Sequence, residues 1–364
     1  MKKIALLVYD VSLTGGAERV AIGMCEELCA SYEVHLLSLF DERSFAPTGD
    51  YRFSYMQKNA ASITAHLFSY ARWLRRYIKE HGIDVVFSIT AGVVGVAAYG
   101  VRRTNARLIY CEHSNLENQT YGKKHFYRQK LGAKKADVTV TLTERDRENF
   151  KRTFGLPDEK LRVIPNWFTK NESIKASYDT ASKLLISAGR LESVKGQDML
   201  LRAAAGVFAA HPDWHLDIYG DGSCRAALEA QASELGITDF ITFKGNVNDL
   251  ALRYPKYAIF ILPSYYEGLP LVLLEAQAAG LPIVSFDCPT GPAEIVTDGV
   301  NGYLIPTYDT DAMASRINEL IEDEGKRVAF SERSGISIDK FSKARVLALW
   351  HELIDYVIAS KENE

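Results

Sequence analysis

The sequence predicts an α/β protein made of two doubly wound, Rossmann-like domains. Short apolar runs alternate with helical patterns along the chain, and this alternation is typical of a parallel sheet covered by helices on both faces. The chain has 364 residues, which is more than one hydrophobic core usually organises. The alternation pauses in a polar stretch, residues 169–182, and then starts again. We therefore expect a first domain over residues 1–170 and a second over residues 183–342.

The first domain is expected to open with a buried strand, residues 4–8. Met1-Lys-Lys before it resembles the start of a signal peptide, but the apolar run that follows is too short for one. Later patterns predict strands at 33–38, 85–88, 107–111 and 138–142 and helices at 17–30, 65–81, 92–101 and 144–154. Residues 161–168 then end the domain with a short strand and a proline turn.

The second domain is expected to begin with a strand within residues 183–190. Further strands are predicted at 214–219, 241–244, 258–262 and 283–285, with helices that include 198–210 and 313–321. A last helix, about 343–358, has apolar residues at helical spacing. Asp309 and Asp311 have the spacing of a metal-binding pair, but their place just before a helix predicts a helix cap instead.

The composition is that of an ordinary globular protein, with 47% hydrophobic and 24% charged residues. No apolar run reaches the length of a transmembrane helix. The five cysteines show no metal-ligand spacing, and Cys25 and Cys29 are expected to be buried on one helix face. An odd number of cysteines without a signal peptide predicts a protein of the reducing cytoplasm.

The net charge of −3 hides an asymmetry between the two halves of the chain. Residues 1–170 contain 26 Lys and Arg against 18 Asp and Glu, a net of +8, and the remaining residues contain 17 against 28, a net of −11. A basic first half would attract anionic lipid or an acceptor that carries a pyrophosphate. Nucleic acid would also explain the charge, but no nucleic-acid-binding motif accompanies it. Solvated lysines without a partner are the simpler alternative.

Residues 262–280 are the most informative part of the chain for function. Pro270 suits the first position of a helix, where its missing N–H costs nothing. Gly280 suits the left-handed position that follows a helix. The N–H groups of Gly268 and Leu269 would then be free at the positive end of the helix dipole, which is a good site for a phosphate group.

Two carboxylates, Glu267 and Glu275, flank this predicted phosphate site. They can accept hydrogen bonds from hydroxyl groups on either side of a diphosphate. A nucleotide-sugar presents such hydroxyls, from its ribose on one side and from its hexose on the other. The segment therefore predicts a nucleotide-sugar site, and the alternative is an ordinary helix with a surface glutamate.

A second charged motif opens the second domain, Ser187-Ala-Gly-Arg-Leu-Glu-Ser-Val-Lys-Gly-Gln197. Here a strand runs into a glycine and then into a loop that presents Arg190 and Lys195 before the next helix. Arginine offers a planar fork to phosphate oxygens, and lysine offers a compact, mobile charge. Both would offset the charge that develops on a departing diphosphate.

Together these motifs resemble the retaining glycosyltransferases of family four, which have the GT-B fold, and the resemblance covers nearly the whole chain. It implies that Glu275 holds the ribose hydroxyls and that Glu267 contacts the donor sugar. It also implies that Arg190 and Lys195 bind the diphosphate. The expected architecture is two Rossmann-like domains that face each other across a cleft, with the last helix, about 343–364, crossing back to the first domain. Enzymes of this fold generally need no bound metal.

The same resemblance gives roles to several loop glycines and their neighbours. Gly15 and Gly16, after the first strand, let the backbone approach a ligand closely and would face the donor phosphate or the acceptor. Gly220 and the backbone at Val247 would line the pocket for the nucleotide base. Gly291 lies in a turn before a late helix start, where further free N–H groups would lie near the phosphates and the sugar.

His113, in Cys111-Glu-His-Ser-Asn115, follows a strand of the first domain. It matches the position at which many members of the family have a histidine near the donor sugar and the reacting centre. A lone histidine is also often structural.

A basic, aromatic stretch, Tyr121–Lys135, contains six Lys and Arg and no acidic residue. A similar mixture occurs in Tyr70–Lys79. Such mixtures suit an anionic membrane surface or a lipid-linked acceptor. A solvated helix face whose aromatic residues lie in the core explains them equally well. Tyr121–Lys135 is the better candidate for a membrane contact.

The resemblance therefore implies a retaining, metal-independent glycosyltransferase of bacterial polysaccharide or glycoconjugate biosynthesis, in the cytoplasm or on the inner face of the cell membrane. The expected donor is a UDP-hexose or UDP-N-acetylhexosamine, used as a substrate with no cofactor. The expected acceptor, bound by the first domain, is a hydroxyl of a glycan or of a polyprenyl-pyrophosphate-linked sugar. A non-catalytic nucleotide-sugar-binding subunit and a nucleotide-sugar epimerase of similar fold are the alternatives. The epimerase would need acid and base groups around the sugar that these motifs do not supply.

Overall fold

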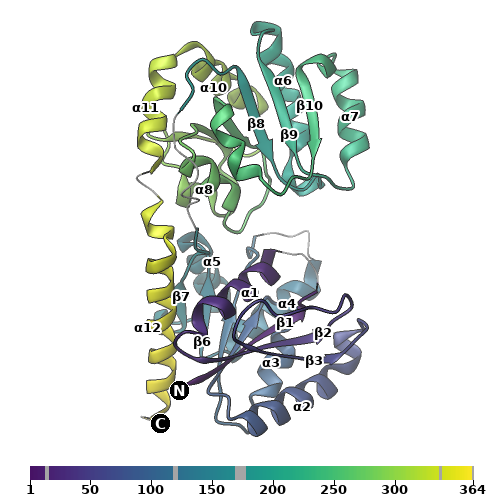
Figure 1. Ribbon diagram of the computed structural model, residues 1–364, viewed down its shortest axis with the longest axis vertical. Helices are drawn as coiled ribbons and strands as arrows, with labels where there is room; N and C mark the ends of the chain where they lie inside the picture. Colours follow the sequence, from purple (N-terminus) through teal and green to yellow (C-terminus); the bar gives the residue numbers. More distant parts are fainter. Residues whose placement is uncertain (13–15, 118–121, 169–177, 336–337, 363–364) are drawn as a thin grey trace. The chain divides into compact units, whose positions relative to one another are not determined.

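The computed structural model describes residues 1–364 except 13–15, 118–121, 169–177, 336–337 and 363–364 (Figure 1). The chain divides into two compact units. The N-terminal unit comprises residues 1–166 and 344–364, and the C-terminal unit comprises residues 167–343. Most of the predicted linker, together with Gly15 and Tyr121, lies outside the described residues.

The N-terminal unit is built on a seven-stranded parallel sheet with the order β3-β2-β1-β4-β5-β6-β7. Its strands are β1 (Lys3–Asp10), β2 (Glu33–Phe40), β3 (Arg52–Gln57), β4 (Val85–Ile89), β5 (Arg107–Cys111), β6 (Val138–Thr141) and β7 (Leu161–Val163). Strand β1 pairs in parallel with both β2 and β4. Its residues 4–8 are all buried, as expected for a parallel strand that is covered on both faces.

The helices of this unit are α1 (Gly16–Leu28), α2 (Ile63–His81), α3 (Val94–Gly100), α4 (Gly122–Lys135), α5 (Glu144–Phe154) and α12 (Lys343–Glu362). From Ala344 onward, α12 belongs to the N-terminal unit although it ends the chain (Figure 1). Trp350 packs edge-to-face on Phe87 of β4, with ring centroids 5.8 Å apart, and Val346 is fully buried. The predicted return of the last helix to the first domain is therefore confirmed.

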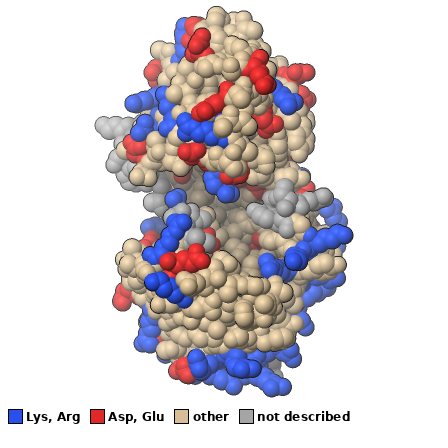
Figure 2. All heavy atoms as spheres, turned by 90° about the vertical axis from the view of Figure 1, so that its right-hand side faces the viewer, with Lys and Arg blue, Asp and Glu red and all other residues tan. Residues whose placement is uncertain are grey.

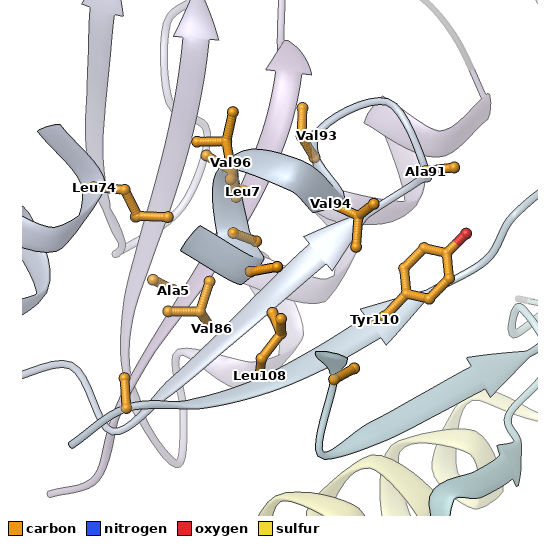
Figure 3. Close-up of a cluster of buried hydrophobic side chains, with 14 of the residues drawn as sticks. Ala5, Leu7, Leu74, Val86, Ala91, Val93, Val94, Val96, Leu108 and Tyr110 are labelled. Atoms are coloured by element: carbon orange, nitrogen blue, oxygen red, sulfur yellow. The ribbon is translucent and has the colours of Figure 1, made fainter. Parts of the chain in front are cut away.

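Helix α3 packs on β4 and β5 over a cluster of buried apolar side chains. Figure 3 shows Val86 of β4, Leu108 of β5 and the α3 residues Val94 and Val96, which belong to one buried apolar cluster. Helix α4 packs beside α3 and β5, and Gly132 is buried on this helix. A Cβ at Gly132 would lie 2.6 Å from Tyr110, so the absence of a side chain lets α4 lie directly against the end of β5.

The C-terminal unit is built on a six-stranded parallel sheet with the order β10-β9-β8-β11-β12-β13. Its strands are β8 (Leu184–Ala188), β9 (His215–Tyr219), β10 (Ile241–Gly245), β11 (Ile259–Leu262), β12 (Ile283–Phe286) and β13 (Gly302–Ile305). Its helices are α6 (Gln197–Ala210), α7 (Arg225–Glu234), α8 (Leu271–Ala278), α9 (Pro292–Ile295), α10 (Thr310–Glu322) and α11 (Glu324–Ser334). Each unit therefore has the predicted doubly wound α/β architecture.

Two local predictions about helix ends are confirmed. Gly280 has a φ of +82° after α8, which is the left-handed conformation expected there. Asp309 caps α10, because its side chain accepts the N–H of Ala312 at 2.9 Å.

Two other local predictions need correction. Pro270 is the N-cap of α8 and the helix begins one residue later, at Leu271. Cys29 is partly exposed rather than buried, and it lies just beyond α1, which ends at Leu28.

Candidate active site

The C-terminal unit places the predicted diphosphate and sugar ligands at the carboxyl edge of its sheet. Arg190 and Lys195 follow β8, and Glu267 follows the adjacent strand β11. The strand order reverses between β8 and β11, because β9 and β10 extend the sheet on one side and β12 and β13 on the other. Ligands of doubly wound proteins bind at such a point, outside the carboxyl ends of the strands.

Backbone hydrogen bonds connect the carboxyl ends of β8, β9 and β10. Gly189 N–H donates to the carbonyl oxygen of Tyr219 at 3.0 Å, and Gly220 N–H donates to that of Gly245 at 2.9 Å. Gly220 has a φ of +123°, and a Cβ there would lie 1.9 Å from the oxygen of Gly189. Gly220 is therefore required by the close approach of the loops themselves. Val247 is half-buried in the segment just after β10.

Lys195 and Glu267 form an ion pair at the centre of the site. Lys195 Nζ lies 2.7 Å from Glu267 Oε1, and Ser264 Oγ donates to the same oxygen at 2.7 Å. The two side chains of the pair are 21% and 10% exposed. Because water reaches both groups, Lys195 can turn toward a ligand phosphate without leaving either charge sealed in the interior.

The loop after β12 fixes the backbone of Glu267 and Gly268. Glu267 N–H donates to the oxygen of Pro289 at 2.9 Å, and Thr290 N–H donates to the oxygen of Glu267 at 2.8 Å. Thr290 Oγ1 also donates to the oxygen of Gly268 at 3.1 Å. Gly291 has a φ of +89°, and a Cβ there would lie 2.4 Å from the same Gly268 oxygen. Gly291 is thus needed for the contact between the two loops.

The anion site expected from the sequence consists of the N–H groups of Gly268 and Leu269 and the start of α8. In the described part of the chain, neither of these N–H groups donates a backbone hydrogen bond to another residue outside a helix or strand. Both groups immediately precede the positive end of α8. The arrangement therefore suits a phosphate group.

Glu275 lies one turn into α8 and is half-buried. Its Oε2 accepts a hydrogen bond from the hydroxyl of Tyr254 at 3.0 Å. Tyr254 is fully buried, and this burial raises the pKa of its hydroxyl well above the usual range. The hydroxyl therefore keeps its proton and acts as a donor to the carboxylate.

In the N-terminal unit, His113 follows β5. Both of its ring nitrogens are buried and have no hydrogen-bond partner among the described residues. Burial lowers the pKa of His113 to about 4, although the nearby Glu112 acts in the opposite direction. The imidazole is therefore neutral at neutral pH and can donate one hydrogen bond and accept another.

Glu112 shapes the short loop that presents His113. It accepts hydrogen bonds from Ser114 N–H at 2.9 Å and from Ser114 Oγ at 2.6 Å, and also from the hydroxyl of Tyr110. Among the residues that the structure describes, no atom lies within 4 Å of the position that a Cβ at Gly16, the start of α1, would occupy. Packing against these residues therefore does not require glycine here.

The two basic, aromatic stretches differ in their exposure. In α2, Tyr70 and Tyr77 are only 1% and 8% exposed, so these aromatic rings belong to the core. In α4, Phe126 and Tyr127 are 40% and 65% exposed and stand among exposed lysines. Figure 2 shows Lys and Arg side chains gathered over parts of the N-terminal unit.

The described residues contain no group of three or more His, Cys, Asp or Glu side chains placed to hold a metal ion. Within the same residues, no helix is both long enough and apolar enough to cross a membrane.

Three residues that hold this site together were not predicted. Ser264 stands close to Glu267 in the sequence, so its buried hydroxyl could have been noticed as a local partner. Thr290 lies in the Pro-Thr-Gly turn after β12, but nothing in the sequence shows that this turn meets Glu267. Tyr254 reads as an ordinary core aromatic residue, and no local signal links it to Glu275.

Two family models match the chain in succession. "Glycosyltransferase Family 4" matches residues 14–169, and "Glycosyl transferases group 1" matches residues 169–335. The chain belongs to this family of glycosyltransferases, and the two parallel-sheet units agree with its GT-B fold.

The chain is similar to several bacterial glycosyltransferases. An uncharacterized glycosyltransferase of Haemophilus influenzae is 29% identical over 97% of this chain and 100% of its own length. The GalNAc-alpha-(1->4)-GalNAc-alpha-(1->3)-diNAcBac-PP-undecaprenol alpha-1,4-N-acetyl-D-galactosaminyltransferase of Campylobacter jejuni is 27% identical, over 97% of this chain and 98% of its own. The solved pneumococcal O-GlcNAc transferase GtfA, in complex with UDP and GlcNAc, is 25% identical with a TM-score of 0.66, over 79% of this chain and 60% of its own.

Proposed function

We propose that this protein is a retaining glycosyltransferase that moves a sugar from a UDP-sugar to a hydroxyl of a lipid-linked glycan, without a bound metal. The observation that carries the proposal is the meeting of Lys195, Glu267 and the start of α8 at the edge of the C-terminal sheet. A helix start binds phosphate, a lysine neutralises it, and a carboxylate accepts bonds from sugar hydroxyls. A nucleotide-diphosphate sugar needs all three.

The relatives support the choice of donor and acceptor. GtfA was solved with UDP and GlcNAc, which favours a UDP-linked N-acetylhexosamine or hexose as the donor here. The name of the Campylobacter relative gives an undecaprenol-diphosphate-linked sugar chain as the acceptor. A lipid-linked glycan with a free hydroxyl is therefore the acceptor class that we propose.

In the proposed reaction, the bond between the anomeric carbon and the diphosphate oxygen breaks while the acceptor oxygen bonds to the same face of the sugar. The acceptor proton passes to the departing phosphate oxygen, so the products are the glycoside and UDP. Arg190 and Lys195 would offset the charge on the diphosphate. Arg190 is exposed and has no ion pair with another described residue, so it is available for a ligand.

Glu267, Glu275 and His113 would bind hydroxyl groups of the substrates. Glu267 would accept bonds from the donor sugar, and Glu275 from the ribose. His113, in the N-terminal unit, would offer its neutral ring, whose nitrogens have no partner among the described residues, to a hydroxyl of a sugar substrate.

We also propose that the N-terminal unit contacts an anionic membrane through α4, on the inner face of the cell membrane. The exposed Phe126 and Tyr127, together with exposed lysines on the same helix, are the combination that binds at a lipid surface. A lipid-linked acceptor would be presented at that surface.

The experiment is a transfer assay with UDP-sugars, a short-chain polyprenyl-diphosphate-linked sugar and EDTA. The proposal expects UDP release, a labelled lipid product and, by NMR, the same anomeric configuration in donor and product. Donor binding without transfer to any such acceptor would favour a non-catalytic subunit. An inverted product would refute retention, and dependence on added metal would refute metal-independence.

A further inference from the structure

We infer that Tyr254 is a positioning residue that acts through Glu275 and gives the site its preference for ribonucleotides. The inference rests on the proposed function, in which Glu275 receives the ribose hydroxyls of the donor.

Tyr254 is held in place from several sides. It opens a short 3-10 turn, Tyr254–Lys256, before β11, and its side chain has no exposed surface. Its ring packs against Phe260 with centroids 5.9 Å apart, and its carbonyl oxygen accepts the N–H of Tyr257 at 3.0 Å. The hydroxyl of Tyr254 is therefore a fixed point within the C-terminal unit.

This fixed hydroxyl holds one oxygen of the Glu275 carboxylate. Glu275 is half-buried and has a long, rotatable side chain whose freedom must be lost when a ligand is bound. The Tyr254 hydroxyl donates to Glu275 Oε2 at 3.0 Å, and hydrogen bonds to a charged acceptor are stronger than neutral ones. The bond therefore fixes the carboxylate before the nucleotide arrives, so less freedom is lost on binding.

Binding of the 2′-hydroxyl of the ribose should depend on this fixed position of the Glu275 carboxylate. A carboxylate in a fixed position accepts a bond from that hydroxyl, whereas a 2′-deoxynucleotide offers nothing in its place. If Tyr254 acts only on Glu275, loss of its hydroxyl should weaken binding of UDP more than binding of 2′-deoxy-UDP. A residue with a purely structural role would weaken both nucleotides alike.

The experiment measures the affinities of UDP and 2′-deoxy-UDP by calorimetry for four forms: the wild type, Tyr254→Phe, Glu275→Ala and the double variant. We expect the wild type to prefer UDP by about tenfold or more and Tyr254→Phe to lose most of that preference through weaker UDP binding. Glu275→Ala should lose it as well, and Tyr254→Phe should then add nothing, because both changes act through one carboxylate. The preference is a ratio, so a partly unfolded sample does not change it.

Tyr303→Phe is the matched control. Tyr303 is 7% exposed, and its hydroxyl donates to Glu319 Oε1 at 2.7 Å, so this variant removes a similar bond elsewhere in the same unit. It should keep the preference of the wild type.

Three results would overturn the inference: a wild type that binds both nucleotides equally, Tyr254→Phe with the full preference, or Tyr254→Phe with equal losses for both. A wild type that binds no UDP would instead refute the proposed function, and the inference with it.

Discussion

Replacing Glu267 by glutamine removes one charge from the site and keeps the shape of the side chain. Ser264 Oγ donates to Glu267 Oε1 at 2.7 Å and can still donate to an amide oxygen. Lys195, whose Nζ lies 2.7 Å from the same oxygen, loses its ion pair. Any sugar hydroxyl that needs a charged acceptor loses it too.

The effects on stability and on catalysis should differ strongly. The Lys195 and Glu267 side chains are 21% and 10% exposed, and a partly exposed pair contributes about 1 kcal/mol to the free energy of unfolding. That loss lowers the melting temperature by about 2–4 °C. Removing one charged contact that acts in the transition state costs about 10²–10³ in rate. Glu267→Gln should therefore remain folded and lose at least about a hundredfold in kcat/KM.

The assay is UDP release and labelled transfer, with a thermal denaturation curve of the same sample. Asp213→Asn is the control, because it breaks the exposed pair between Asp213 and Lys183 in the same unit and should leave the rate unchanged. If Glu267→Gln kept kcat/KM within about threefold of the wild type, well short of the loss expected for a charged contact in the transition state, the role given to Glu267 would be wrong.

Three further predictions concern the membrane contact, the loop glycines and a buried acid. The double variant Lys123→Glu, Lys124→Glu should lower the affinity for phosphatidylglycerol vesicles, measured by sedimentation, at least about thirtyfold, since each basic residue near such a surface contributes about 1 kcal/mol. Unchanged affinity would count against the membrane contact. Gly220→Ala should lower the free energy of unfolding by about 3 kcal/mol, because a Cβ there would lie 1.9 Å from a carbonyl oxygen. The control, Gly206→Ala, adds a Cβ with no described atom within 4 Å and should raise the free energy of unfolding by about 0.5–1 kcal/mol. Urea denaturation measures both, and equal effects would contradict the close approach. Burial raises the pKa of Asp146 to about 8, against about 3.9 in the unfolded chain. The protonated Asp146 therefore contributes fully to stability below pH 4, and this contribution is lost as the pH rises through 8. Asp146→Asn should flatten the curve of melting temperature against pH between these values, and an unchanged slope would contradict the prediction.

The central strands of both sheets could be predicted from the sequence because they are buried on both faces. Strands such as β1 and β11 give continuous apolar runs that differ clearly from the amphipathic helices. Strand β3 (Arg52–Gln57) was not predicted, since it is a half-exposed edge strand without a continuous apolar run. Strand β13 (Gly302–Ile305), also at a sheet edge, is short and begins with glycine, and it was missed as well.

In the site, the short motifs could be predicted from the sequence, but the contacts between distant residues could not. Glu267, Glu275 and Lys195 stand in short motifs with glycine and proline at fixed spacings, so the sequence alone indicates their chemistry. The bond between Lys195 and Glu267 joins residues 72 positions apart, and the bond between Tyr254 and Glu275 joins residues 21 apart. The first contact depends on β8 and β11 becoming neighbours in the sheet, and the second on the packing of α8 against the segment that precedes β11. A motif contains neither kind of information.

A thermal-shift screen of the purified wild type against UDP-, GDP- and ADP-sugars in EDTA tests most directly whether the C-terminal unit is a nucleotide-sugar site. A ligand at one hundred times its Kd stabilises the folded state by about 2.7 kcal/mol. We predict that at least one UDP-sugar raises the melting temperature of the wild type and that Lys195→Met abolishes the shift. A melting temperature that no nucleotide-sugar changes would contradict a donor site in this unit.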